Sequence, residues 1–445
     1  MKIIITNPGR IYEERPLSWR QETAPAKACV TLTEKRDQTM LGFGAALTDS
    51  ACIQFNKLDT GVRDELLEEI FSPEKMNFSI ARICVGASDY AAVPYHFAPV
   101  ADDMAMEHFD ASHDDTDCIP IIRKAQDLNP DLYIYSSPWS PPGWMKTSGS
   151  MYGGWMIDRY VEAYAKYYLK FIQYYASKGI KISAMTPQNE AETDQTSRMP
   201  ACLWHPDIEA RFIKVMRKLL DENGLSDMKI WMMDHNFLMW HRIVHMLKDP
   251  ELRAAVAGTA WHPYEGHPEM VEWVREQYPE GENHWTEGGM LPSLLGGMIG
   301  MMGGGRPRIT VANLMQGFNI GINNGIQSIT VWNLALDEAG YPNIGPFGCR
   351  GTVEISRDGK RVKRSDEYYV MGHFTKYVKR GAKRVVLDCH GVPSHFAVAA
   401  FENPNGQIVV QIANTETFDS GMTLRLGDKV VDLWVLRESA NTVLL

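Results

Sequence analysis

The sequence predicts an α/β fold, a (β/α)8 TIM barrel with an attached β-sandwich domain formed by the N- and C-terminal segments. Three observations predict this fold. Short apolar runs alternate with longer amphipathic stretches through residues 41–380, eight such runs occur there, and both ends of the chain are rich in short strand-like runs. Alternating strands and helices form a parallel sheet, and eight such units close into a barrel.

Eight apolar runs are the candidate barrel strands. Each is short and bounded by polar or turn-forming residues, as is typical of a buried strand. In chain order they are Met40–Gly44, Ser79–Val85, Leu132–Ser136, Lys181–Thr186, Lys229–Asp234, Val256–Trp261, His284–Glu287 and Ile326–Trp332.

Amphipathic stretches between these runs predict the helices. The clearest is Asp158–Lys178, which is followed by Gly179 as a helix C-terminus requires. The last helix before the C-terminal strands is expected at Ser365–Arg380. The others are expected at Asp59–Ile70, Asp115–Leu128, Pro206–Glu222, Trp240–Leu247 and Arg308–Asn324.

The two ends of the chain carry the remaining strand signals. Residues 1–40 contain two short runs, and residues 381–445 contain four with a strong hairpin turn at Asn403–Gly406. Neither end can bury a strand face alone, so we expect both to form one β-sandwich. The predicted division is therefore 1–40 and 381–445 for the sandwich and 41–380 for the catalytic barrel. The runs are Met1–Thr6, Cys29–Leu32, Phe396–Phe401, Ile408–Ile412, Met422–Leu426 and Val430–Leu436.

Composition excludes several classes of protein. The formal net charge of -10 argues against a nucleic-acid partner. The seven cysteines are odd in number and form no CxxC pair, which indicates free thiols in a reducing compartment. No run of about 18 apolar residues occurs, so no stable membrane insertion is expected. The apolar run at the N-terminus is too short for a signal peptide, and a cytoplasmic location is expected.

Two glutamates stand where a barrel places its catalytic groups. Glu190 follows the fourth predicted strand and Glu287 ends the seventh, and catalytic residues lie at the carboxyl ends of barrel strands. Glycoside hydrolysis uses such a pair, one as acid and one as ionised nucleophile, about 5–5.5 Å apart in retaining enzymes. A single strand-end glutamate is more often a solvated loop residue. Glu192 and Glu265 are the nearby acidic residues that compete for these roles.

Six further strand-end residues suit a sugar site. Flat aromatic faces can cover the C–H face of a pyranose ring, although a strand-end tryptophan is more often packing. The aromatic residues are Trp139, Tyr264 and Trp332. Polar side chains can bind its hydroxyl groups. These are Asp89, Asn189 and His262.

No metal or organic cofactor is expected. Four histidines lie in this region, but their spacing matches neither HxxxH nor HExxH. They are His205, His262, His267 and His284. A glycine- and methionine-rich segment, 290–305, follows the seventh strand. It either lines an aglycone site or forms a helix turn packed on the barrel or on another subunit, and the oligomeric state is not predicted.

Five motifs carry a family resemblance that spans nearly the whole chain. They are Leu41–Asp49 (LGFGAALTD), Ser137–Lys146 (SPWSPPGWMK), Thr186–Glu190 (TPQNE), Trp332–Leu336 (WNLAL) and Gly372–Tyr377 (GHFTKY). They resemble glycoside hydrolase family 30, the glucosylceramidase-like retaining β-glycosidases. The resemblance implies the same barrel and sandwich, with Glu190 as acid/base and Glu287 as nucleophile. It also places sugar-binding positions at the six residues above.

The chain departs from the family pattern at three places. Ala191 replaces a proline, Thr286 replaces the usual serine before the nucleophile, and the segment after the seventh strand does not align. The segment that does not align bears on the aglycone preference more than on the chemistry.

The predicted activity is that of an exo-acting retaining β-glycosidase on a gluco-configured sugar, with a small glycoside or an oligosaccharide as substrate. Asp89 favours a hexose with a free 6-hydroxyl, while β-xylosidase, β-fucosidase and β-1,6-glucanase are the alternatives on the same scaffold. A non-catalytic sugar-binding barrel is the alternative from another class. A Schiff-base lyase is disfavoured because no lysine ends a predicted strand and Lys146 lies well into a loop.

Overall fold

The computed structural model describes residues 1–22, 26–289 and 309–445, and the chain divides into two compact units. The barrel unit comprises Gly44–Gly288 and Thr330–Lys363. The second unit comprises Met1–Phe43, Gly289–Ile329 and Arg364–Leu445. The segment 290–305, predicted to line an aglycone site or form a helix turn, lies outside the described residues.

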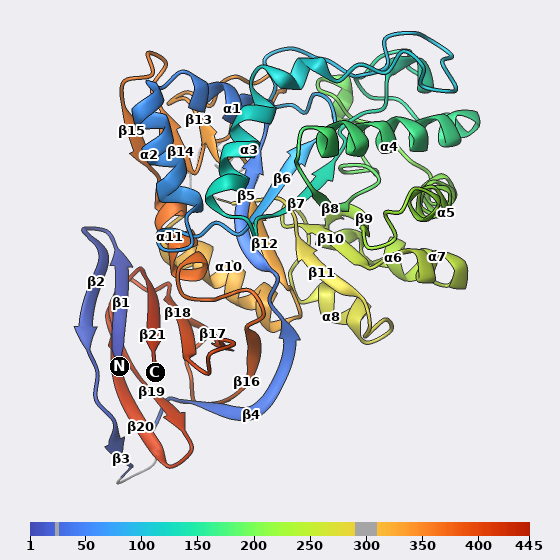
Figure 1. The fold of residues 1–445 in the computed structure, drawn as a ribbon. Coiled ribbons are helices and arrows are strands. Elements are labelled where there is room, and N and C mark those ends of the chain that lie inside the picture. Colours follow the sequence, from blue (N-terminus) through green and yellow to red (C-terminus); the bar gives the residue numbers. More distant parts are fainter. Residues whose placement is uncertain (23–25, 290–308) are drawn as a thin grey trace, which may run out of the picture. The chain divides into compact units, whose positions relative to one another are not determined.

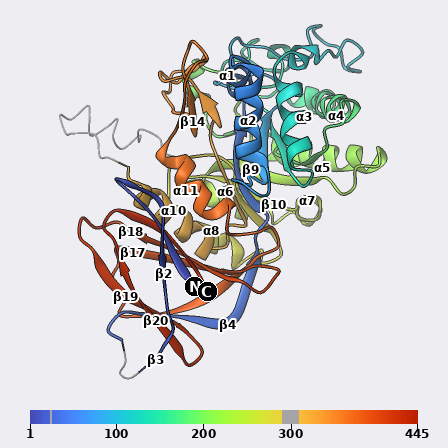
Figure 2. The ribbon, with the colours of Figure 1, turned by 60° about the vertical axis from the view of Figure 1, so that its left-hand side comes forward.

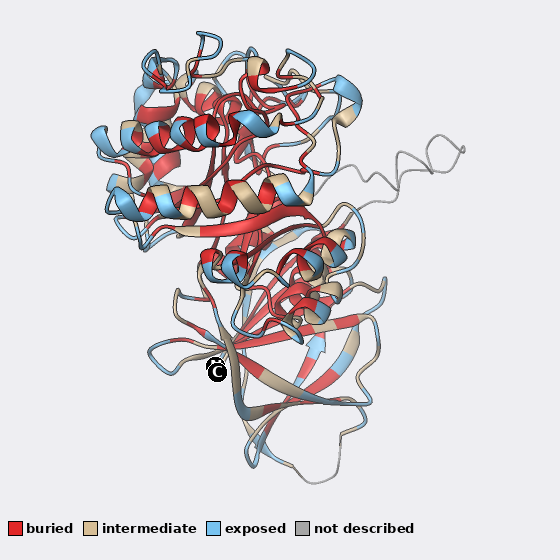
Figure 3. Ribbon diagram, turned by 90° about the vertical axis from the view of Figure 1, so that its right-hand side faces the viewer, coloured by how far each residue is buried: buried red, intermediate tan, exposed pale blue. Residues whose placement is uncertain are grey.

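Eight strands close into a barrel in the order β10-β11-β12-β5-β6-β7-β8-β9, which confirms the predicted fold (Figure 1). Neighbours from β5 to β11 pair in parallel. All residues of β5, β6 and β10 are buried, as expected where helices cover the outer face (Figure 3). The strands are β5 (Gly42–Leu47), β6 (Ile80–Cys84), β7 (Tyr133–Ser137), β8 (Ile182–Met185), β9 (Lys229–Asn236), β10 (Gly258–His262), β11 (Glu282–Trp285) and β12 (Ser328–Val331).

Five helices of the barrel unit lie where the sequence predicts them, and three others, which begin at Asp49, Pro250 and Met270, were not predicted. Pro206 begins α5, the preceding His205 side chain accepts from the Asp207 N–H, and Phe212 and Met216 lie on its buried face. The helices are α1 (Asp49–Asn56), α2 (Thr60–Phe71), α3 (Cys118–Leu128), α4 (Val161–Ser177), α5 (Pro206–Glu222), α6 (Trp240–Met246), α7 (Pro250–Ala255) and α8 (Met270–Arg275). A small sheet beyond β12 contains β13 (Ala335–Leu336), β14 (Val353–Ile355) and β15 (Val362–Arg364).

The second unit is built on a ten-stranded sheet in the order β2-β1-β21-β18-β17-β16-β4-β19-β20-β3. Its apolar core includes Ile5, Val30 and Val410. Strands from both chain ends form the predicted β-sandwich (Figure 2). Its strands are β1 (Lys2–Asn7), β2 (Arg10–Pro16), β3 (Arg20–Gln21), β4 (Cys29–Thr39), β16 (Lys383–His390), β17 (Phe396–Glu402), β18 (Ile408–Asn414), β19 (Ser420–Leu426), β20 (Lys429–Val435) and β21 (Ser439–Leu444).

Two helices, α10 (Val311–Asn323) and α11 (Asp366–Thr375), belong to this second unit. The α10 helix packs on β17 and β18, where the Asn319 and Asn323 side chains donate to strand carbonyls. The proposed division of the chain at residues 40 and 380 stays a prediction. In the described part of the chain, no helix combines the length and apolar character that crossing a membrane requires.

Candidate active site

The two predicted carboxylates lie together at the carboxyl end of the barrel. Glu190 follows β8 and Glu287 follows β11, and both are buried. One ligand atom from each of Glu190, His262 and Glu287 lies within 4.8 Å of the other two. The structure therefore brings two glutamates from well-separated strands into one small volume.

Both oxygens of the Glu287 carboxylate have protein donors. The Tyr264 hydroxyl donates to Oε1 at 2.6 Å, and Arg82 Nη1 donates to Oε2 at 2.5 Å. A neutral donor and a cation that face one carboxylate favour its ionised form and fix its orientation.

Arg82 is a buried cation at the centre of the site. It projects from β6, and its remaining donors reach Asp234 Oδ2 at 2.7 Å, Asn189 Oδ1 at 2.9 Å and Ser137 Oγ at 3.1 Å. Burial opposes its charge, but the carboxylates of Asp234 and Glu287 raise the pKa of Arg82 above its usual value. The guanidinium therefore remains charged and holds four polar partners in fixed positions.

Stacked tryptophans contact the Arg82 guanidinium. Its carbon lies 4.6 Å from the Trp139 ring centroid and 5.5 Å from that of Trp332. The two indoles stack on each other at 5.0 Å, and both are almost fully buried. Trp139 and Trp332 thus support Arg82, and their predicted role as a sugar platform stays a prediction.

Glu190 is held from two sides. Its Oε1 lies 3.0 Å from His262 Nδ1, and its Oε2 accepts from Gln195 Nε2 at 2.6 Å. The other ring nitrogen of His262 lies 3.0 Å from Asp234 Oδ1. His262 therefore bridges Asp234 and Glu190, and both of its nitrogens are engaged by carboxylates.

The contact between His262 and Glu190 shares one proton, and the surrounding charges decide which of the two groups carries it. Burial opposes the charge of His262, but Glu287, Asp234 and Glu190 together raise its pKa to about 9. Burial would also raise the pKa of Glu190, yet the hydrogen bond from His262 together with the charges of His235 and His262 outweighs it and lowers that pKa. Burial raises the pKa of Glu287, against the charges of His262 and Arg82. At neutral pH the proton of the His262–Glu190 pair is therefore on the imidazole.

Asp89 and Asn189 present polar atoms without protein partners. Asp89 Oδ1 is buried with no hydrogen-bond partner, and burial raises the pKa of this carboxyl well above its usual value. Asn189 uses its Oδ1 on Arg82, which leaves its amide nitrogen able to donate. Buried polar atoms are normally paired, so an unpaired carboxyl oxygen indicates a place for a ligand hydroxyl.

The loop beyond β13 packs closely on Asp89. The Ile344 N–H donates to the Asp89 carbonyl at 2.8 Å, and a Cβ at Gly345 would lie 2.7 Å from the Asp89 Cβ. A glycine is therefore required at 345, and this loop bounds the site on the Asp89 side.

Most of the predicted site residues join one connected network, but three contributors were not predicted. Hydrogen bonds link Glu190, Glu287, Asn189, His262 and Tyr264 into this network. Trp139 and Trp332 join it by their contact with Arg82. Asp89 stands apart, because it has no direct bond to the network. The unpredicted residues are Arg82, Asp234 and Gln195. The sequence held a signal for two of them: Arg82 is a lone charge inside the apolar run Ile80–Cys84, and Asp234 ends the predicted strand Lys229–Asp234.

The competing acidic residues lie outside the network. Glu192 pairs with Arg242, and Glu265 is exposed. Among the described residues, Glu190, His262 and Glu287 are the group whose ligand atoms are close enough to hold a metal ion. Because carboxylates already engage both nitrogens of His262, its lone pair is not available to a metal in this arrangement.

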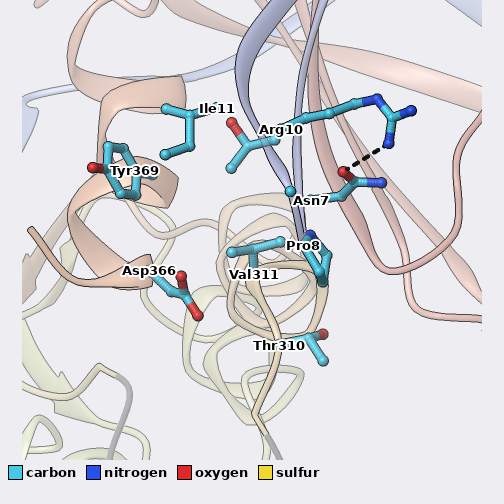
Figure 4. Close-up of a pocket in the computed structure, with 10 residues that line it drawn as sticks. Asn7, Pro8, Arg10, Ile11, Thr310, Val311, Asp366 and Tyr369 are labelled. Atoms are coloured by element: carbon cyan, nitrogen blue, oxygen red, sulfur yellow. Dashed lines mark hydrogen bonds between the residues drawn. The ribbon is translucent and has the colours of Figure 1, made fainter.

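A cavity of about 330 Å³ in the second unit lacks the required chemistry (Figure 4). Asp366 is the carboxylate among its lining residues, and Arg10 of this pocket pairs with Glu13 at 2.9 Å. One carboxylate and a neutralised arginine cannot supply an acid and a nucleophile, so this cavity is not a rival catalytic site.

Comparison with known proteins identifies the family. The model of the glycosyl hydrolase family 30 TIM-barrel domain matches residues 40–378, and that of the family 30 β-sandwich domain matches 381–443. The chain belongs to glycosyl hydrolase family 30. It is thus a glycoside hydrolase, and the predicted resemblance is confirmed.

Proteins named for two different activities are similar to this chain. A putative glucosylceramidase 4 of Caenorhabditis elegans is 28% identical, covering 88% of this chain and 77% of that protein. An endo-1,6-β-D-glucanase of Neurospora crassa is 27% identical, covering 92% and 86%. The solved endo-β-1,6-glucanase BT3312 is 26% identical with a TM-score of 0.87, covering 99% and 98%.

Proposed function

We propose that this family 30 hydrolase is a retaining β-glycosidase that removes a terminal β-linked, gluco-configured sugar by double displacement. The observation that carries the proposal is the separation of Glu190 and Glu287, whose ligand oxygens lie within 4.8 Å. Retaining enzymes place their carboxyl groups about 5–5.5 Å apart, whereas inverting enzymes leave about 6.5–9.5 Å for a water.

In the first step, Glu287 is the nucleophile. Arg82 and Tyr264 hold its carboxylate ionised and oriented. One Glu287 oxygen forms a bond to the anomeric carbon while the bond from that carbon to the leaving oxygen breaks. The leaving oxygen takes a proton from Glu190, and Glu190 draws that proton from His262 across their 3.0 Å contact.

In the second step, Glu190 acts as base. Glu287 is now an ester and has lost its charge, which removes one of the groups that raise the pKa of His262. Glu190 accepts a proton from water as the water oxygen attacks the anomeric carbon. The bond to Glu287 breaks, the sugar leaves with its configuration retained, and the proton returns to the His262–Glu190 pair.

Unpaired polar atoms support the choice of sugar. Asp89 Oδ1 offers a buried acceptor to the 4- and 6-hydroxyls, and the Asn189 amide offers a donor to the 2-hydroxyl. The close packing of Gly345 on Asp89 favours a terminal sugar. Similarity to two endo-1,6-glucanases favours one second candidate, cleavage within a β-1,6-glucan.

Rates on nitrophenyl β-glucoside, β-xyloside and β-fucoside, together with release of sugar from β-1,6-glucan, separate these candidates. We expect the glucoside to be cleaved fastest. Oligosaccharide products from the glucan would show the endo activity instead. Sugar-dependent thermal stabilisation without turnover of any substrate would indicate a non-catalytic sugar-binding barrel.

Trapping with a 2-deoxy-2-fluoroglucoside tests the mechanism. The label should appear on the peptide that contains Glu287, and Glu287→Gln should abolish turnover. A label on a different residue would overturn the assignment. So would a Glu287→Gln variant that retains about a tenth of the wild-type rate, because loss of the nucleophile should lower the rate by far more than that.

A further inference from the structure

Gln195 makes a contact with Glu190 that the mechanism above does not use. Its Nε2 donates to Glu190 Oε2 at 2.6 Å, while His262 faces Oε1 at 3.0 Å. An amide N–H can only donate, so Oε2 must accept and cannot carry a proton directed at Gln195. His262 faces Oε1, so the proton that it supplies to Glu190 arrives on Oε1.

The backbone around Gln195 is held in an unusual conformation. Gln195, Thr196 and Ser197 have φ values of 51°, 55° and 56°, the left-handed region that non-glycine residues rarely occupy. Such strain persists only where surrounding contacts determine it, and it is frequent at functional sites. Here the strained turn directs the Gln195 side chain back onto Glu190, five residues earlier.

Contacts on both sides maintain this turn. The Thr196 N–H donates to Asp194 Oδ1 at 2.9 Å, and Arg198 Nε donates to Thr196 Oγ1 at 2.6 Å. A Cβ at Gly153 would lie 2.3 Å from Ser197 Oγ, so the neighbouring loop keeps a glycine there to admit Ser197.

A further contact ties the turn to the loop beyond β13. The Arg198 guanidinium carbon lies 5.8 Å from the Phe347 ring centroid. The turn is therefore anchored to the loop that also packs on Asp89.

We propose that Gln195 is a positioning residue for Glu190, which fixes the plane of its carboxyl group and reserves Oε1 as the proton-carrying oxygen. This proposal rests on the acid/base role of Glu190 and refines it. Without the amide, the carboxyl can rotate and carry its proton on Oε2, away from His262. Protonation of the leaving oxygen should then suffer, whereas attack by Glu287 should not.

The dependence of rate on the leaving group isolates this role. A 2,4-dinitrophenyl glucoside needs little protonation of its leaving oxygen, whereas a 4-methylphenyl glucoside depends on it. For Gln195→Ala and Gln195→Glu, we expect kcat/KM on the 4-methylphenyl glucoside to fall about tenfold. This loss is smaller than the full effect of general acid catalysis, because Glu190 itself remains. On the dinitrophenyl glucoside, kcat/KM should change by less than about threefold, because the acid contributes little there.

Ser197→Gly is the matched control. Glycine adopts the same positive φ without strain, and the side chain that donates to Glu190 from this turn is that of Gln195. Its two kcat/KM values should match those of the wild type. Equal losses on both substrates in the Gln195 variants, or no loss on either, would overturn the positioning role. Circular dichroism of each variant excludes misfolding as the cause of equal losses.

Glu190→Ala, measured in parallel, separates the two levels of the proposal. If that variant loses the 4-methylphenyl activity selectively but the Gln195 variants do not, the role of Gln195 is wrong and that of Glu190 stands. If Glu190→Ala itself shows no leaving-group selectivity, the proposed acid/base role is wrong.

Discussion

Replacement of Arg82 by methionine tests the electrostatic basis of the site. The variant removes a fully buried cation whose guanidinium donates to Asp234 at 2.7 Å and to Glu287 at 2.5 Å. Removal of one partner of a buried ion pair typically costs about 3–5 kcal/mol, because it leaves the other charge buried without compensation. We therefore expect Arg82→Met to lower the free energy of unfolding by about that amount.

The same change should move the acid limb of activity. Glu287 must be ionised to attack, so activity is lost as pH falls through its pKa. The charge of Arg82 lowers that pKa, and its removal should raise it by about one to three units, the usual effect of a close opposite charge. The acid limb of kcat/KM should therefore shift to higher pH by that interval, and Arg82→Lys should show a smaller shift.

Arg242→Met provides the matched control for the Arg82 variant. Arg242 is also buried and bonds Glu209 at 2.7 Å, but it contacts neither catalytic glutamate. It should lose comparable stability in urea unfolding while keeping the wild-type acid limb. If Arg82→Met lost stability but kept the acid limb of the wild type, the proposed control of Glu287 by Arg82 would be refuted.

Two further predictions follow from the site. Asp89→Ala should lower kcat/KM on the nitrophenyl glucoside about tenfold more than on the xyloside, the value of one further hydrogen bond, because the xyloside keeps the 4-hydroxyl but lacks the 6-hydroxyl; equal losses would deny contact with the 6-hydroxyl. His262 has a pKa raised to about 9 against about 6.5 in the unfolded chain, so its contribution to stability is complete below pH 6.5 and is lost as pH rises through 9. Urea unfolding at pH 6.5 and pH 9.5 should show this loss of stability, and kcat/KM should fall over the same interval. If a His262→Gln variant lost the same stability at alkaline pH, the assignment of this loss to His262 would be contradicted.

The strands of the barrel were predictable because their burial leaves a direct trace in the sequence. Four of the eight predicted runs begin within one residue of an observed strand and the other four begin two residues away, since apolar residues are required on both faces. Strands β16 and β21 were not predicted. Arg384, Asp388 and His390 interrupt the apolar pattern of β16, and β21 contains buried Asn441 and Thr442, whose polar groups bond within the sheet.

The site was only partly predictable for a different reason. Glu190 and Glu287 could be found because strand ends meet at one mouth, but their charge states depend on partners distant in sequence. Arg82 reaches Glu287 across 205 positions, and His262 reaches Glu190 across 72. A general acid commonly has a raised pKa, yet in this site the imidazole of His262 holds the proton instead. Gln195 depends on a left-handed turn that no local sequence signal announces.

The pairing of β1 with β21 has a consequence for the order of folding. Lys2 lies opposite Leu444 in the register, and β21 is also the neighbour of β18. Strand β1 can pair early with its sequence neighbour β2, but its pairing with β21 must wait until residues 439–444 have been made. Such long-range pairing is slow, and unpaired edges promote aggregation in the meantime. We expect the sandwich to form only after synthesis of the barrel strands, and the β1 segment to need shielding during translation.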